Sequence, residues 1–471
     1  MKPSSVLGKI DLYLLPLLLL ASFLAHLDKN SLAYAAVLGM GNDLHLHGQQ
    51  YSWLGSIFYI GYLLMELPTS WLLTHLPIGK YLGSSLILWG GCLCTMAACT
   101  SFAAAATVRF CLGVLEAGLL PSCIVITACW YRREEQPLRA ALWFGPFSGI
   151  FGGILAYAIG GMRTGIPVWK YDQALFLIYG GSTIFVGIVC LVAIPDSHGT
   201  AWFLSKTERE EAKLRTQENQ TGEDMRKGWK LSHVVEATKD AKYWTVFVFG
   251  VCQSITNAGI TNFNPLILSG FGYSKTTTVL LAAPQGFVAL VAQVAASIVA
   301  LYIPNIRCLL WVLSCFPALA GVVIVQLVDV TKNRIAALMG LYLTGFYNVS
   351  WVLAMSLISS NTAGATKKSF VSVSMAISYA VGNMVGPQFF LESQKPQYHL
   401  GIGVMIFSFV MMAVCGMVYW TICIRQNEAR DRTRRESSPL IDPTSLAGLH
   451  LAADESQDKT DFEIATFRYT Y

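Results

Sequence analysis

Charged residues are scarce in this sequence. Only 13% of its 471 residues are Asp, Glu, Lys or Arg, whereas 54% are hydrophobic. Soluble globular proteins carry about 25% charged residues, so about half of the usual surface charge is missing, which fits a protein whose outer wall faces lipid. The net charge of +5 is modest, and the basic residues lie in short, scattered clusters. Nucleic-acid binding would require them to be concentrated on one face, so we exclude that class of partner.

The twelve cysteines lack the spacing of metal ligands. The sequence contains no C-x-x-C and no C-x-x-H pair, which are the short spacings typical of structural zinc sites. By our assignment all twelve lie inside apolar runs, where cysteine packs as a small polarizable side chain. We therefore expect no metal site and no cofactor. No arrangement of a nucleophile and a base is visible either, so we do not expect an enzyme.

Long apolar runs predict two sets of six transmembrane helices. About 20 residues are needed to cross the hydrocarbon core, and a single segment there must satisfy its backbone hydrogen bonds as a helix. The sequence therefore predicts an all-α membrane protein. The predicted spans are 11–38, 51–75, 81–101, 104–130, 139–161, 173–195, 243–268, 276–303, 308–328, 335–359, 369–391 and 400–424.

Polar segments separate and follow the two sets of spans. We expect a first bundle over 1–195, a linker over 196–242, a second bundle over 243–424 and a tail over 425–471. Within the linker, residues 206–213 have the i,i+4 charge pairs of a solvated helix. The tail begins with several arginines and then mixes Ser, Asp and Glu, a composition that predicts disorder.

The loops on one side of the predicted membrane contain more lysine and arginine than the loops on the other side. Both termini and the linker lie on the richer side. Because cytoplasmic loops carry the excess of basic residues, we expect a multi-pass protein of the plasma membrane with both termini in the cytoplasm. The richer set is Lys80, Arg132, Arg133, Arg139, Arg307, Lys367, Lys368 and the arginines of the early tail. The poorer set is Arg163, Lys170, Lys275, Lys332, Arg334 and Lys395.

Charged residues well inside the predicted spans occur only in the first set. They are Asp28, Lys29, Glu66, Arg109 and Glu116. A charge in hydrocarbon costs several kcal/mol unless it is paired or faces water, so such residues are functional candidates. The second six spans contain no Asp, Glu, Lys or Arg. We therefore expect proton or charge coupling in the first half and neutral polar groups in the second.

Arg109 and Glu116 are two helical turns apart and therefore share a face. Arg109 keeps its charge and can hold a carboxylate through two hydrogen bonds, so it suits either an anionic substrate or an acid such as Asp28. Asp28 and Glu116 are the candidates for proton exchange. A structural ion pair that only joins helices is the alternative for these residues. The hydrogen-bonding candidates of the second half are Asn257, Asn264, Asn348, Asn383 and Gln388, which could also act as interhelical contacts.

Several segments carry a family resemblance: 27–31, 66–68, 109–118 with Pro121, 130–135, 361–368, 382–383 and 386–390. They resemble the major facilitator superfamily and, within it, the fungal anion:cation symporters typified by allantoate permease. The resemblance implies the major facilitator fold, in which two six-helix bundles are related by a pseudo-two-fold axis and enclose a site at mid-membrane. It also implies proton-coupled uptake of a small organic anion, such as a carboxylate or a vitamin-like molecule.

The same resemblance bears on individual site residues. It adds Asn30 to the candidates and favours Asp28 as the proton carrier, because the first span lines the central cavity in the proteins that this chain resembles. Lys29 stands where the family usually has arginine, which keeps the positive charge but loses the two-pronged geometry. The expected partners are a small organic anion, protons and the lipid bilayer.

Two other functions remain open from the sequence. Gly145-Pro146, followed by Gly149, Gly152 and Gly153, partly matches the glycine-proline pattern of drug/proton antiporters, so export of a metabolite is the first alternative. A nutrient sensor that does not transport is the second, although such a sensor would be expected to have a long tail for signalling partners.

Overall fold

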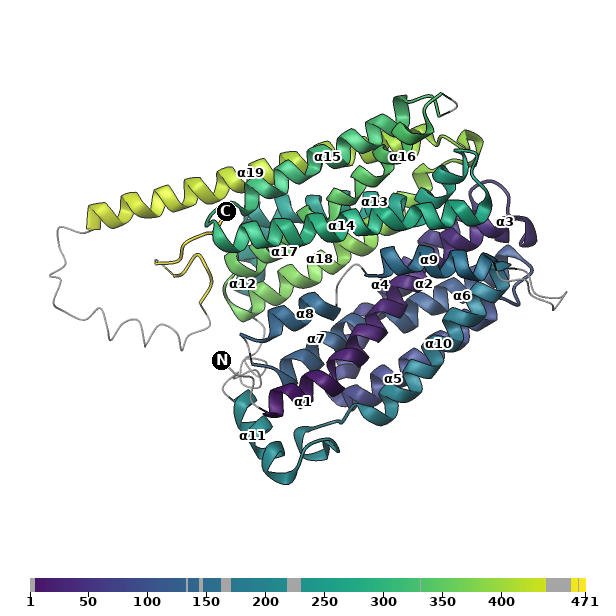
Figure 1. The fold of residues 1–471 in the computed structure, drawn as a ribbon. Coiled ribbons are helices and arrows are strands. Elements are labelled where there is room, and N and C mark those ends of the chain that lie inside the picture. The colour runs from purple at the N-terminus through teal and green to yellow at the C-terminus, as the bar shows by residue number, and fades with distance from the viewer. Residues whose placement is uncertain are drawn as a thin grey trace.

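The structure is a computed structural model of the chain. It describes residues 5–132, 134–143, 147–161, 171–217, 230–330, 332–437, 459–464 and 466–471. The regular elements in these residues are α-helices and short 3-10 helices (Figure 1). This is the expected outcome for apolar segments that must pair their own N–H and C=O groups within hydrocarbon.

The first bundle contains the first six predicted spans. α4 packs along α6, and α5 packs along α10. The fourth span is interrupted at residues 117–118, between α6 and α7. The elements of this half are α1 (Ser5–Tyr13), α2 (Leu15–Leu38), α3 (Met40–Asp43), α4 (Gln50–His75), α5 (Ile78–Met96), α6 (Phe102–Glu116), α7 (Leu119–Trp130), α8 (Gln136–Trp143), α9 (Phe147–Gly161) and α10 (Tyr171–Ala193).

The second bundle repeats this pattern of long helices. Side chains cap several of them: Ser274 accepts a hydrogen bond from the backbone N–H of Thr277, and Asn333 accepts one from that of Ala336. Its helices are α13 (Ala241–Ser269), α14 (Lys275–Tyr302), α15 (Arg307–Leu327), α16 (Arg334–Leu343), α17 (Tyr347–Asn361), α18 (Ala365–Val385) and α19 (His399–Ser437).

Every predicted span coincides with a long helix or with consecutive helices of the described residues. Eight of these are long and apolar enough to cross a membrane by length and composition, and they run over 6–38, 102–130, 173–193, 275–302, 307–327, 334–361, 365–389 and 399–434. The all-α architecture of two six-helix bundles is therefore confirmed.

Both termini lie at one end of the bundles, which we call the terminal face (Figure 1). The two linker helices, α11 (Lys206–Gln217) and α12 (Leu231–Lys239), lie at the same end. α11 is tied to the first bundle, because Lys9 pairs with Glu208 at 2.7 Å. α12 is tied to the second bundle, because Lys367 pairs with Glu236 at 2.9 Å. Each linker helix thus belongs to one bundle.

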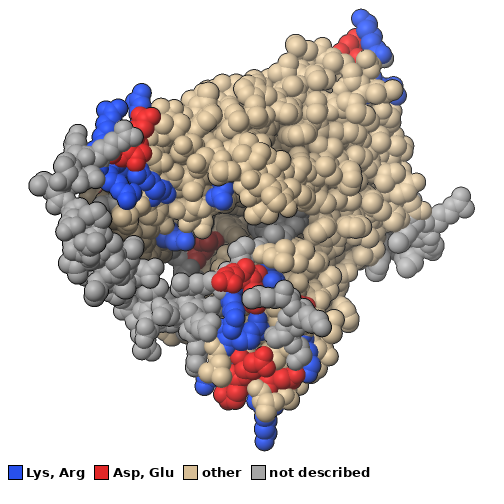
Figure 2. Space-filling model, turned by 60° about the vertical axis from the view of Figure 1, so that its left-hand side comes forward, with Lys and Arg blue, Asp and Glu red and all other residues tan. Residues whose placement is uncertain are grey.

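The two bundles meet toward the opposite end, which we call the distal face. Tyr51 donates a hydrogen bond to the carbonyl of Asn262 at 2.7 Å, and Ser56 donates one to that of Met384 at 2.6 Å. Lys275 reaches across to the carbonyl of Leu38 at 3.1 Å. At the terminal face, by contrast, Figure 2 shows a hollow between the bundles with charged residues around it. This arrangement is closed at the distal face and open toward the terminal face.

The tail differs from its predicted disorder in the parts that the structure describes. α19 continues to Ser437, beyond the predicted end of the last span, and residues 459–464 and 466–471 pack against the terminal face of the second bundle. Asp461 and Tyr469 are buried there. The prediction of disorder is therefore wrong for these residues, because a polar composition says nothing about specific partners supplied by distant helices.

Candidate functional site

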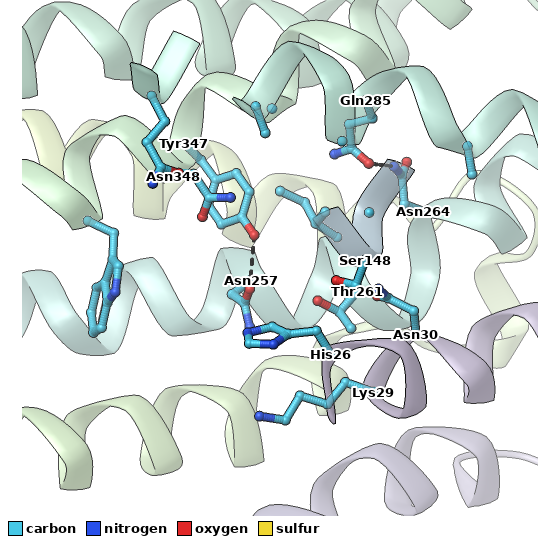
Figure 3. Close-up of a pocket in the computed structure, with 18 of the residues that line it drawn as sticks. His26, Lys29, Asn30, Ser148, Asn257, Thr261, Asn264, Gln285, Tyr347 and Asn348 are labelled. Atoms are coloured by element: carbon cyan, nitrogen blue, oxygen red, sulfur yellow. Dashed lines mark hydrogen bonds between the residues drawn. The ribbon is translucent and has the colours of Figure 1, made fainter. Parts of the chain in front are cut away.

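A cavity of about 200 Å³ lies between the two bundles (Figure 3). Its walls come from α2 and α9 of the first bundle and from α13, α14, α17 and α18 of the second. The first bundle contributes the cationic side and the second contributes mostly amide and hydroxyl groups. This division follows the distribution of charge along the sequence, in which the second set of spans is neutral.

One hydrogen-bonded chain of neutral groups forms part of the second bundle's wall. The Tyr347 hydroxyl donates to Asn257 Oδ1 at 2.9 Å, and Asn257 Nδ2 donates to Asn383 Oδ1 at 2.8 Å. Asn383 in turn donates to the carbonyl of Tyr379 at 2.8 Å. Because each member fixes the orientation of the next, the polar atoms at the cavity surface are held in place before any ligand arrives.

A second chain crosses from α13 to α14. Asn264 Nδ2 donates to Gln285 Oε1, and Gln285 Nε2 donates to the Thr344 hydroxyl at 2.7 Å. Asn264 and Gln285 line the cavity (Figure 3). Amide groups can donate and accept at once, so this wall can bind a solute that itself presents both donors and acceptors.

Lys29 supplies a positive charge at the cavity wall. Its Nζ lies 2.9 Å from Glu116 Oε1, and the two side chains are 16% and 2% exposed. The ammonium also lies 5.9 Å from the ring centroids of Phe58 and Tyr62, close enough for cation–π attraction. The second Glu116 oxygen, Oε2, is buried and makes no hydrogen bond within the described residues. Lys29 therefore touches both the cavity and a carboxylate that is only half satisfied.

Asp28 and Arg109 form a separate cluster behind this wall. Asp28 is 1% exposed and accepts hydrogen bonds from Trp89 Nε1 at 2.8 Å and from the Ser31 hydroxyl at 3.2 Å. Arg109 NH1 lies 4.0 Å from Asp28 Oδ1, and Arg109 Nε donates to the carbonyl of Leu54 at 3.3 Å. This cluster satisfies its charges internally and joins α2, α4, α5 and α6 of the first bundle.

No group of three or more His, Cys, Asp or Glu side chains is placed to hold a metal ion within the part of the chain that the structure describes. The groups at and beside the cavity are the Lys29 ammonium, the His26 imidazole, the buried Glu116 carboxylate and a set of amides and hydroxyls. Such groups bind and release a solute, and the carboxylate can take up a proton.

The sequence profile of the Major Facilitator Superfamily matches residues 18–387 of this chain. The chain belongs to the Major Facilitator Superfamily. It is thus a secondary transporter, and the superfamily membership supports the prediction that it is not an enzyme.

Named relatives and solved structures agree with this membership. An uncharacterized transporter of Schizosaccharomyces pombe is 35% identical, over 99% of this chain and 87% of the relative. Allantoate permease of Saccharomyces cerevisiae is 34% identical, over 98% of this chain and 85% of the permease. A thiamine pathway transporter of the same yeast is 30% identical, over 99% of this chain and 86% of that protein.

Among solved structures, a bacterial homologue of the human lysosomal transporter Spinster covers 89% of this chain and 96% of its own, with a TM-score of 0.61 at 15% identity. A D-xylose-proton symporter covers 87% of this chain and 97% of its own, with a TM-score of 0.62 at 13% identity. At these identities the likeness establishes the fold. The resemblance to the superfamily predicted from the sequence is confirmed.

Within this superfamily fold, the sequence-derived candidates fall into two groups. Lys29, Asn30, Asn257, Asn264 and Asn348 line the cavity. Asp28, Arg109 and Glu116 lie inside the first bundle, behind the cavity wall. Asn383 lies behind Asn257, from which it accepts a hydrogen bond. Gln388 lies where the two bundles meet and donates to the Ser56 hydroxyl at 2.8 Å. Gly145 and Pro146, which suggested an antiporter, lie outside the described residues.

Several cavity residues were missed from the sequence. They include His26, Tyr34, Ser148, Gln253, Thr261, Gln285 and Tyr347. The two glutamines carry the same signal as the asparagines, namely an amide inside an apolar span, and could have been included on that basis. His26 lies one helical turn before Lys29, so its shared face was also visible. The hydroxyl and tyrosine residues carry no signal that separates them from ordinary helix packing.

Proposed function

We propose that this transporter takes up a small organic anion together with protons, and that Lys29 and Glu116 couple the two. The observation that carries the proposal is the contact between the cavity-lining Lys29 ammonium and the buried Glu116 carboxylate, at 2.9 Å. While Glu116 is ionised, it is the counter-ion of Lys29. When Glu116 takes a proton, Lys29 loses that partner.

A buried cation without a counter-ion is strongly unfavourable. A carboxylate that enters the cavity can then replace Glu116 as the partner of Lys29, so proton binding and anion binding favour each other. For a monoanion, one proton makes the combined step electrically neutral. Each further proton would add about 2.3 kcal/mol per 100 mV of membrane potential. The free Oε2 of Glu116 is the atom that could receive the proton without breaking an existing hydrogen bond.

Asp28, which the sequence favoured as the proton carrier, has less support under this proposal. Its two oxygens already accept from Trp89 and Ser31, and Arg109 lies nearby. The hydrogen bonds from Trp89 and Ser31 and the charge of Arg109 all stabilise the ionised form of Asp28, whereas Oε2 of Glu116 has no such donor within the described residues. Asp28 is also not among the residues that line the cavity, whereas its neighbour Lys29 is.

The neutral wall supports a more specific substrate class, a carboxylate that also carries amide or ureido groups. Asn257, Asn264, Asn348 and Gln285 all present amides to the cavity, and amides pair well with groups that both donate and accept. Allantoate, which the name of the yeast relative specifies, is a carboxylate with ureido groups of this kind. It is therefore a rational first compound to test.

The test is uptake into proteoliposomes with and without an inward proton gradient. We expect labelled allantoate, or a related ureido carboxylate, to accumulate only with the gradient, and the neutral analogue allantoin not to accumulate. Glu116→Gln should abolish accumulation but retain exchange of labelled for unlabelled solute. Lys29→Gln should lose both, because its binding charge is gone. Asp28→Asn is the matched acid-to-amide comparison and should retain gradient-driven accumulation if it folds.

Two results would count against the proposal. Full accumulation by Glu116→Gln would exclude that residue as the proton carrier. Release of preloaded solute on imposing the inward gradient would indicate antiport instead of symport.

A further inference from the structure

The last described segment of the chain lies across the terminal ends of most helices of the second bundle. Thr460 donates to Glu236 of α12 at 3.0 Å, and Thr470 N–H donates to Asn361 of α17 at 2.8 Å. The backbone N–H of Arg307, at the start of α15, donates to the carbonyl of Tyr471 at 3.3 Å. This segment, residues 459–464 and 466–471, thus contacts helix ends that are far apart in the sequence.

Asp461 is the centre of the contact. Its side chain is 0% exposed and accepts hydrogen bonds from Lys367 Nζ at 2.6 Å and from Lys242 Nζ at 3.3 Å. The Tyr469 hydroxyl donates to the same carboxylate at 2.8 Å. Burial alone would raise the pKa of Asp461, but the two lysines and Tyr469 outweigh it and hold that pKa below its ordinary value. Asp461 is therefore ionised at neutral pH.

The surrounding cations lie against aromatic rings of the same segment. Lys242 Nζ lies 3.3 Å from the Tyr469 ring centroid, and Lys367 Nζ lies 4.3 Å from that of Phe462. Lys242 and Lys367 belong to the starts of α13 and α18, and both are nearly buried, at 5% and 3% exposure of their side chains. Asp240, at the N-cap of α13, also lies 3.6 Å from Lys242 Nζ and 3.7 Å from Lys367 Nζ. The second bundle thus presents two desolvated lysines and one carboxylate, and the segment supplies a second carboxylate and two rings.

Arg430 of α19 fixes the backbone of the segment. Its guanidinium donates to the carbonyls of Phe467 and Asp461 and to the Tyr469 hydroxyl. Asn427, one turn earlier, donates to the carbonyl of Tyr469 at 2.9 Å and accepts from its N–H at 3.0 Å. Recognition therefore involves the main chain as well as the side chains, which is typical of a bound peptide.

We propose that the terminal ends of α12, α13, α17, α18 and α19 form an intramolecular peptide-binding site whose ligand is the chain's own aromatic segment, residues 459–464 and 466–471, anchored by the buried Asp461. In the docked state the segment holds α12 against the second bundle, because Lys367 is shared by Glu236 of α12 and by Asp461. The linker is thereby fastened at its second-bundle end. This inference is independent of the transported solute and of the proton carrier.

Hydrogen exchange of the full-length protein in detergent tests the docking without any substrate. Asp461→Asn removes the charge that the two lysines surround, and we expect amide exchange in 459–471 to rise about tenfold or more, as for the loss of one charge-assisted hydrogen bond. Exchange in α12 should rise as well. Glu463→Gln is the matched control: it removes an equal charge from the same segment, but that carboxylate contacts the backbone N–H of Thr460.

A second, milder variant keeps the test valid if Asp461→Asn misfolds. Tyr469→Phe keeps the ring that covers Lys242 and removes only the hydroxyl that joins Asp461 to Arg430, so it should also speed exchange in 459–471, by a smaller factor. Unchanged exchange in both Asp461→Asn and Tyr469→Phe would overturn the inference. So would an equal increase in Glu463→Gln, since that would indicate a general effect of charge and not a specific site.

Discussion

Arg109 and Lys29 are cations of the same bundle with different surroundings. Arg109 is 3% exposed and contacts Asp28 and the carbonyl of Leu54, whereas Lys29 lines the cavity. Of these two cations, Lys29 is the one whose positive charge lies at the cavity surface. Arg109 instead faces Asp28 of its own bundle. Replacing Arg109 and replacing Lys29 should therefore have different effects.

Replacing Arg109 should lower stability more than it changes substrate affinity. Arg109→Ala leaves the buried Asp28 carboxylate without its cation, a change that costs about 3–5 kcal/mol in buried pairs. Arg109→Lys keeps the charge but loses the fork geometry and should cost less. Thermal unfolding of the purified variants measures this order. If Arg109→Ala unfolded like the parent protein but had a much higher KM for the solute, Arg109 would belong to the binding site after all.

Close packing of neighbouring helices depends on glycine at particular crossings. Gly113 of α6 lies against the backbone of α4 so closely that a Cβ would overlap the carbonyl of Phe58. A Cβ on Gly61 of α4 would likewise overlap the carbonyl of Phe110 in α6. Small residues at such crossings allow backbones to approach within a membrane. The crossing also positions Glu116, which lies at the end of α6, near α2.

Gly113→Ala should therefore destabilise the first bundle. The new methyl group must push α4 and α6 apart, and overpacking of this kind costs about 1–3 kcal/mol. Gly91→Ala in α5 is the control, because nothing lies within 4 Å of a Cβ at that position; there the change should be neutral or slightly stabilising, since Ala favours helix over Gly. Thermal unfolding temperatures in detergent distinguish the two, and equal temperatures would show that α4 and α6 adjust without strain.

At the scale of the whole molecule, the two faces differ in how the bundles meet. Hydrogen bonds such as those from Tyr51 and Ser56 join the bundles toward the distal face, while the terminal face is hollowed between them (Figure 2). Alternating access requires the bundles to exchange this arrangement by rocking around a fixed site. We propose that the terminal face is cytoplasmic, because the basic residues of the loops are more frequent there.

Tag accessibility on intact cells tests this orientation. An epitope inserted within 218–229, between the two linker helices, should bind antibody only after the cells are permeabilised. The same epitope within 162–170, the connection between the end of α9 and the start of α10, is the matched insertion and should bind without permeabilisation. Antibody binding to the linker epitope on intact cells would reverse the proposed orientation.

The sequence alone determined the membrane architecture. The twelve spans could be predicted because a helix in hydrocarbon needs a long apolar run, a property that each segment carries by itself. The candidate charges could be found for the same reason, since Asp28, Lys29, Arg109 and Glu116 stand out against an apolar background. Helical periodicity also predicted that Arg109 and Glu116 share a face.

Only the tertiary structure decided which of those residues line the cavity and which residues pair with one another. Lys29 lines the cavity and Asp28 beside it does not, because adjacent helical residues point about 100° apart and the rotation of α2 is set by its neighbours. The pairing of Lys29 with Glu116 and the docking of Asp461 between Lys242 and Lys367 join segments about 90 to 220 residues apart. A local pattern carries no information about such pairs, because the partner of a buried charge is chosen by the packing of whole helices.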